Sequence, residues 1–179
     1  FRLATNALYQ IENASIALTV CAVLKDSGVK LDDRLTKEAV SKTHWAGRME
    51  PVKENLYVDG AHNPQGIRSF VDSVNSLYES EELSDATLLF SVVSDKNYEQ
   101  MIKILCECKH FKHIYVTMTG GARRLSSEII KQTFEVYLPG ISIEISDSVD
   151  RVIHEWDNGL MFATGSLYLV GDVVRALER

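Results

Sequence analysis

Cysteine is scarce in this chain of 179 residues, which has only Cys21, Cys106 and Cys108. They form neither an even set that could pair nor a CxxC motif, so a disulfide-rich secreted domain is excluded and a reducing, cytoplasmic setting is indicated. Apolar runs are short as well, and none approaches the roughly 18 residues of a membrane-spanning helix. With 45% hydrophobic and 25% charged residues, the composition is typical of a soluble globular protein.

Several well-known motifs are also missing. No GxGxxG follows the first predicted strand, no GxxxxGK[ST] is present, and no GxSxG occurs, so a dinucleotide fingerprint, a Walker A loop and a hydrolase elbow are all excluded. Cys106, Cys108, His110 and His113 match no common zinc spacing, and we expect no metal site there. The net charge of −6 argues against nucleic acid and anionic membranes as partners.

Short apolar runs alternate with amphipathic stretches from residue 56 to the end of the chain. This alternation predicts right-handed βαβ units and a Rossmann-like α/β class with a mostly parallel sheet of about six strands. The expected strands are 56–59, 87–93, 113–117, 141–145 and 160–163, with a further antiparallel edge strand in 48–53. The expected helices between and after them are 64–78, 97–109, 126–134, 148–156 and 166–177.

Two earlier helices, 11–24 and 35–42, do not fit this alternation. We therefore expect two parts: residues 1–44 as the helical end of a preceding domain, and residues 45–179 as the α/β domain, with a hinge at 43–47. The chain starts without Met, at Phe1, which is the pattern of a cut inside a longer protein.

The chemistry of an open parallel sheet lies beyond the carboxyl ends of its strands. Residues 59–64 (DGAHNP) form such a loop, in which Asn63 can cap a helix and Pro64 suits its first position. Asp59 is placed to bind ribose hydroxyls, and His62 is placed to contact a carboxylate or phosphate. Equally, both residues could simply brace the turn.

Three further loops are candidates at the same edge. Residues 94–96 (SDK) place an acid and a base after one strand. They could act on a ligand, or they could form a solvated charge pair that caps a helix. Residues 164–166 (TGS) could offer hydroxyl and backbone donors to an anion. Alternatively, Ser166 could be an ordinary helix N-cap. Residues 120–124 (GGARR) carry paired guanidinium groups that suit phosphate or carboxylate, with a weak signal.

Taken together, these segments resemble one family. Residues 9–14 (YQIENA) are similar to a helix start "HQxxNA", 45–50 (WAGRME) to "WxGRxE", 59–64 to "DGAHNP", 94–96 to "xDKD" and 164–168 to "TGSLY". Five motifs in this order and spacing resemble the C-terminal portion of folylpolyglutamate synthases and bifunctional dihydrofolate synthases, relatives of the Mur peptide ligases. Tyr9 stands where that family often has His.

The resemblance implies an ATP-dependent ligase. ATP phosphorylates a substrate carboxylate, and the amino group of L-glutamate attacks the acyl phosphate to form an amide. It implies Asn13 and Arg48 as ATP contacts, with Arg48 near the phosphates, and Asp59 as the ribose ligand.

The remaining roles also come from the resemblance. His62 and Ser166 would line the glutamate side of the cleft, and Lys96 would complete the catalytic set. The Mg²⁺ ligands, the P-loop and the pterin pocket belong to segments outside this chain, which alone should be inactive.

The expected partners are therefore small molecules: ATP, L-glutamate, and folate or dihydropteroate, bound by a monomer. A Mur ligase acting on a UDP-muropeptide and a non-catalytic nucleotide-binding module stay open as alternatives. An NAD-dependent oxidoreductase is disfavoured by the missing glycine fingerprint.

Overall fold

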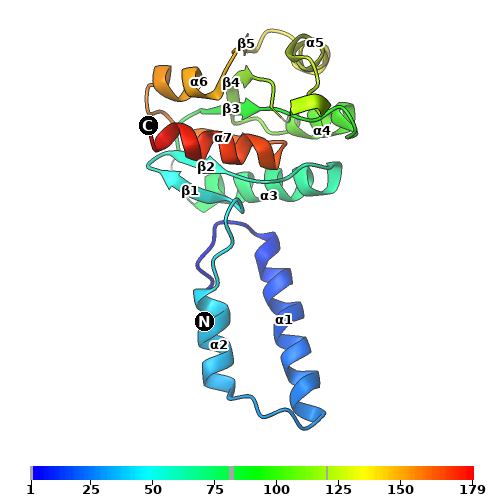
Figure 1. Ribbon diagram of the computed structural model, residues 1–179, viewed down its shortest axis with the longest axis vertical. Coiled ribbons are helices and arrows are strands. Elements are labelled where there is room, and N and C mark those ends of the chain that lie inside the picture. Colours follow the sequence, from blue (N-terminus) through cyan, green and yellow to red (C-terminus); the bar gives the residue numbers. More distant parts are fainter. Residues whose placement is uncertain (1, 81–82, 120) are drawn as a thin grey trace.

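The protein folds into an α/β domain from which a helical hairpin projects (Figure 1). The computed structural model describes residues 2–80, 83–119 and 121–179. The strands are β1 (Glu50–Lys53), β2 (Leu56–Val58), β3 (Ala86–Phe90), β4 (Phe111–Val116), β5 (Ser142–Ile145) and β6 (Met161–Thr164). The helices are α1 (Tyr9–Asp26), α2 (Asp33–Lys42), α3 (Pro64–Ser80), α4 (Tyr98–Leu105), α5 (Ser127–Tyr137), α6 (Val149–Glu155) and α7 (Leu167–Leu177), with a 3-10 turn η1 (Gly121–Arg123).

The six strands form one sheet in the order β1-β2-β6-β3-β4-β5. All neighbours pair in parallel except β1, which pairs antiparallel with β2 at the edge. The predicted Rossmann-like class, the mostly parallel six-stranded sheet and the antiparallel edge strand are therefore confirmed. Insertion of β6 between β2 and β3 brings the loops after these three strands to the same edge of the sheet.

Helices cover both faces of the sheet, and each face has its own core. One core joins α3, α4 and α5 to the sheet through Phe70, Met101, Phe134 and Phe162. The other joins α6 and α7 to the sheet through Val152 and Val173 among others. Because both faces are buried, the central strands are apolar on both sides, as β3 and β6 are.

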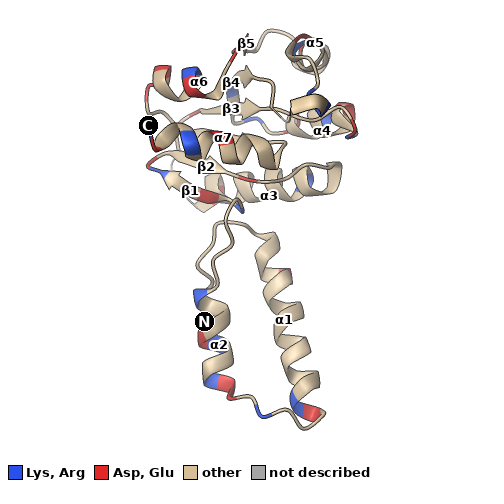
Figure 2. Ribbon diagram, viewed as in Figure 1, with Lys and Arg blue, Asp and Glu red and all other residues tan. Residues whose placement is uncertain are grey.

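The hairpin of α1 and α2 has no such cover. Neither helix has a buried residue, and α1 carries no charged side chain between Glu12 and Lys25, which Figure 2 shows as a long uncharged stretch. In the described residues no helix is both long enough and apolar enough to span a membrane.

Two elements end several residues earlier than predicted. The strand predicted over 87–93 ends at Phe90, although Val92 and Val93 are buried, because those two residues pack in the loop and Val93 bridges Arg124 instead of extending the ladder. The helix predicted over 97–109 spans only Tyr98–Leu105, since the chain must turn before β4 begins at Phe111.

Candidate functional site

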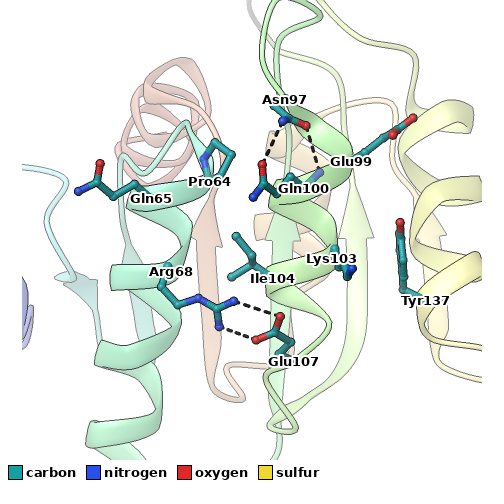
Figure 3. Close-up of a pocket in the computed structure, with 10 residues that line it drawn as sticks. All are labelled: Pro64, Gln65, Arg68, Asn97, Glu99, Gln100, Lys103, Ile104, Glu107 and Tyr137. Atoms are coloured by element: carbon teal, nitrogen blue, oxygen red, sulfur yellow. Dashed lines mark hydrogen bonds and ion pairs between the residues drawn. The ribbon is translucent and has the colours of Figure 1, made fainter.

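The hollows in the described part of the surface include two large ones. The larger, about 790 Å³, is a groove between α3 and α4 (Figure 3). Its lining is largely polar and includes the bidentate pair of Arg68 and Glu107, which joins α3 to the turn after α4. None of the predicted site residues lines it.

The second hollow contains two of the predicted residues. It is a crevice of about 630 Å³ between the helical hairpin and the segment that leads into β1, and it is lined by Asn13, Trp45 and Arg48 among others. This volume suits a drug-sized or nucleotide-sized ligand. The Trp45 side chain is 66% exposed there, so an aromatic face is available to a planar ligand.

Asp59 lies directly after β2 and is held by three donors. Its Oδ1 accepts from the backbone N–H of Ala61 at 2.8 Å, and its Oδ2 accepts from the Met49 N–H at 3.0 Å and from the Tyr9 hydroxyl at 2.7 Å. Burial raises the pKa of the Asp59 carboxyl above its ordinary value, while these hydrogen bonds and the nearby charge of Arg48 act to lower it. The residue is 1% exposed.

Arg48 approaches the turn that follows Asp59. A Cβ at Gly60 would lie 3.2 Å from the Arg48 guanidinium and 2.4 Å from the side chain of Leu167, so glycine is required for this approach. Glu50 supports the segment by accepting from the Gly47 N–H at 2.6 Å. The half-buried Arg48 therefore lies between the crevice and the turn, where it can face an anion.

His62 and Ser166 lie on neighbouring loops, joined by the hydrogen bond from Gly165 N–H to the Ala61 carbonyl at 3.0 Å. The His62 Nδ1 donates to the Gly60 carbonyl at 2.8 Å, which leaves Nε2 as the ring nitrogen for a ligand. Ser166 is buried and caps α7, where its hydroxyl accepts from the Tyr168 N–H at 3.2 Å. The Ser N-cap is thus present, and Asn63 and Pro64 begin α3 as predicted.

A salt bridge joins the loops that follow β3 and β4. Asp95 pairs with Arg123 at 3.0 Å, and Arg123 also donates to the Tyr168 hydroxyl at 3.0 Å. One of the paired guanidinium groups predicted in 120–124 is therefore already engaged, and Gly120 lies outside the described residues. Lys96 is half-buried beside Asp95 on the same loop.

The candidate residues thus form two groups at one edge of the sheet. Asn13 and Arg48 line the crevice and Asp59 begins the adjoining turn, whereas His62 lies later in that turn and Ser166 lies on the loop hydrogen-bonded to it. Among the described residues, no hydrogen bond or ion pair joins the Lys96 side chain to either group. Within residues 2–80, 83–119 and 121–179, no cluster of three His, Cys, Asp or Glu side chains could hold a metal ion.

This geometry agrees with a match to a family model, described as the glutamate ligase domain of Mur ligases, over residues 47–169. The chain belongs to the Mur ligase glutamate ligase domain family. The family assignment confirms the resemblance seen in the five motifs. It also accounts for the sheet and for the polar loops at its carboxyl edge.

The chain is also similar to individual proteins and solved structures. The chain is 27% identical over 180 residues to a dihydrofolate synthase/folylpolyglutamate synthase from Bacillus subtilis, and the match covers 95% of this chain and 39% of that protein. The crystal structure of folylpolyglutamate synthase from Thermotoga maritima has a TM-score of 0.78 at 26% identity, over 98% of this chain and 40% of that one.

A third relative was solved with ligands. It is a bifunctional folylpolyglutamate synthase/dihydrofolate synthase with Mn, AMPPNP and L-glutamate bound, with a TM-score of 0.67 at 24% identity, over 90% of this chain and 38% of that one. The chain therefore spans about two fifths of the length of these relatives.

Sequence reasoning missed two contacts of this site. Tyr9 was noted only as a departure from a motif, yet it binds Asp59 from 50 residues earlier in the chain. Arg123 joins its own loop to the loop after β3 and to α7, and only the pair of arginines indicated a role in the sequence.

Proposed function

We propose that this chain is the C-terminal portion of an ATP-dependent ligase that adds L-glutamate to a folate, with dihydropteroate as a second substrate in a bifunctional enzyme. The observation that carries the proposal is that the crevice with Asn13 and Arg48 adjoins the Asp59 turn. That turn contains His62 and is hydrogen-bonded to the loop that carries Ser166. A nucleotide and an amino acid could therefore meet at one turn.

The crevice fits a nucleotide. It offers an exposed aromatic ring, an exposed amide on α1 and a guanidinium group, which match a base, its polar edge and a phosphate. Arg48 would bind the phosphates, Asn13 the base and Asp59 the ribose. ATP supplies the phosphoryl group that activates the substrate carboxylate. We expect the ligands of Mg²⁺ in segments outside this chain.

The other side of the turn would receive glutamate. His62 offers Nε2, and the loop around Ser166 lies at the start of α7, where backbone N–H groups and the helix dipole favour a carboxylate. Lys96 would add a positive charge. Orientation of the amino group against the acyl phosphate, and stabilisation of the charge that develops during attack, would supply most of the rate.

The helical hairpin supports a two-part organisation. A helix that is apolar on all sides is normally buried, whereas α1 exposes Ile11, Ile16, Val20, Val23 and Leu24. We infer that residues 1–44 are the end of a central ligase domain that covers this helix, and that residues 45–179 form the C-terminal domain. We expect the complete enzyme to be cytoplasmic and monomeric, and this chain alone to be inactive.

The proposal predicts that Arg48→Ala weakens ADP binding by about tenfold or more, because a charge-assisted contact to phosphate is lost. Isothermal titration of this chain and of the longer enzyme measures the affinity, and circular dichroism should show an unchanged fold. Arg68→Ala is the matched control, since Arg68 is an exposed arginine that pairs with Glu107 in the turn after α4.

Equal ADP affinity in Arg48→Ala and the unaltered protein would contradict the assignment. Asp59→Ala should also weaken binding, but it is the less specific variant. It removes the acceptor of two backbone N–H groups, so it should lower stability as well.

A further inference from the structure

The carboxylate of Asp59 is enclosed, although it is the group expected to bind ribose. A carboxylate has about four acceptor positions, and three are filled by Tyr9, Met49 and Ala61. With the residue only 1% exposed, a ribose hydroxyl cannot reach Asp59 unless one donor leaves.

The three donors differ in how easily they can leave. The Met49 and Ala61 donors are backbone N–H groups of the segments that surround Asp59, and moving them would mean refolding the turn. Tyr9 is the side-chain donor, and it comes from the first residue of α1. A rotation of this partly buried side chain, or a small shift of the hairpin, would free Oδ2 while the turn stays intact.

We propose that the Tyr9 hydroxyl occupies the ribose position on Asp59, and that a 2′- or 3′-hydroxyl of the bound nucleotide replaces it. This inference rests on the proposed function. The exchange is hydroxyl for hydroxyl, so Asp59 keeps the same number of hydrogen bonds in both states. Tyr9 thereby keeps a buried carboxylate satisfied while no nucleotide is bound, at the cost of competing with ribose.

The surroundings of Tyr9 keep its phenol protonated, so that it can donate a hydrogen bond. Burial, and then the negative charge of Asp59, raise the pKa of the Tyr9 phenol well above its ordinary value, although Arg48 opposes this effect. The phenol is therefore protonated at neutral pH and donates to Oδ2. Displacing it would also detach the start of α1 from the 59–64 turn, so nucleotide binding and hairpin position would be coupled.

The test is the ADP affinity of Tyr9→Phe, which removes the hydroxyl and keeps the ring. We expect the dissociation constant for ADP to fall roughly 2- to 10-fold, because the ribose no longer competes for Oδ2. The affinity for 2′,3′-dideoxy-ADP, which has no hydroxyl to exchange, should not change. Tyr137→Phe on α5 is the matched control, and it should leave both affinities unchanged.

Tyr9→Leu provides a second removal of the hydroxyl with the same expected direction, and thermal melts establish that each variant is folded. ADP binding that is unchanged or weakened in both variants, or an equal gain for the dideoxy nucleotide, would overturn the exchange while leaving the proposed function in place. No binding of ADP to the unaltered protein would overturn both.

Discussion

At Gly165, the backbone of the site leaves no room for a side chain. Its φ of +107° lies in a region that residues with side chains rarely adopt, and an added Cβ would lie 2.4 Å from the Ser91 carbonyl oxygen and from the Phe90 ring. These neighbours belong to the end of β3 and cannot give way without moving the strand. Glycine thus allows the loop that carries Ser166 to cross the end of β3.

We therefore predict that Gly165→Ala lowers the free energy of unfolding by about 2 kcal/mol or more, through backbone strain and the clash together. Gly140→Ala is the matched control, because Gly140 also has a positive φ, +92°, but has nothing within 4 Å of an added Cβ. Its loss should be limited to about 1 kcal/mol of strain. Equal losses in urea unfolding would show that the contact with β3 does not matter.

Prediction from the sequence succeeded at the residue scale where the signal was local. The DGAHNP segment predicted a turn capped by Asn63, and the structure has it. The partner of Asp59 could not be predicted, because Tyr9 is 50 residues away and only the folded chain brings the two together. The same holds for Arg123, whose partners are Asp95 on the loop after β3 and Tyr168 in α7.

At the scale of elements, α1 leaves many of its apolar side chains uncovered by the rest of the described structure. Its exposed side chains include Ile16 at 64% and Val20 at 51%, and no core residue comes from it. A contiguous apolar surface of this kind marks an interface rather than a solvated face. It fits a helix that packs against a domain outside this chain.

Accordingly, the double substitution Ile16→Lys with Val20→Lys should reduce both the fluorescence of bound ANS and the self-association of this chain. The two lysines interrupt the apolar surface without touching either core of the sheet. Val136→Lys on α5 is the control, since Val136 is 75% exposed but isolated from α1. ANS fluorescence and sedimentation measure the effects, and an equal change in the control would contradict the interface.

The alternation of strands and helices was predictable because each element carries its own periodicity. The order of strands was not, since the position of β6 between β2 and β3 depends on contacts between distant segments. The strand at Ala86–Phe90 was predicted too long because an apolar run reports burial rather than pairing, and Val92 and Val93 are buried in a loop.

At the scale of the whole molecule, the proposed function assigns one side of a ligase site to this chain. It spans 39% of the Bacillus subtilis relative. It contains the crevice and the loops proposed to face glutamate, and its described part has no cluster of side chains that could hold a metal ion. We expect the opposite wall of the cleft to come from the domain that packs on α1. Turnover should therefore need the longer protein.

The most direct test is glutamate-dependent ADP release by that longer protein with MgATP, comparing tetrahydrofolate, dihydropteroate and a UDP-muropeptide, with this chain as the inactive control. We predict release with tetrahydrofolate, with dihydropteroate showing whether the enzyme is bifunctional. Release with the muropeptide alone, or none with any acceptor, would contradict the folate ligase.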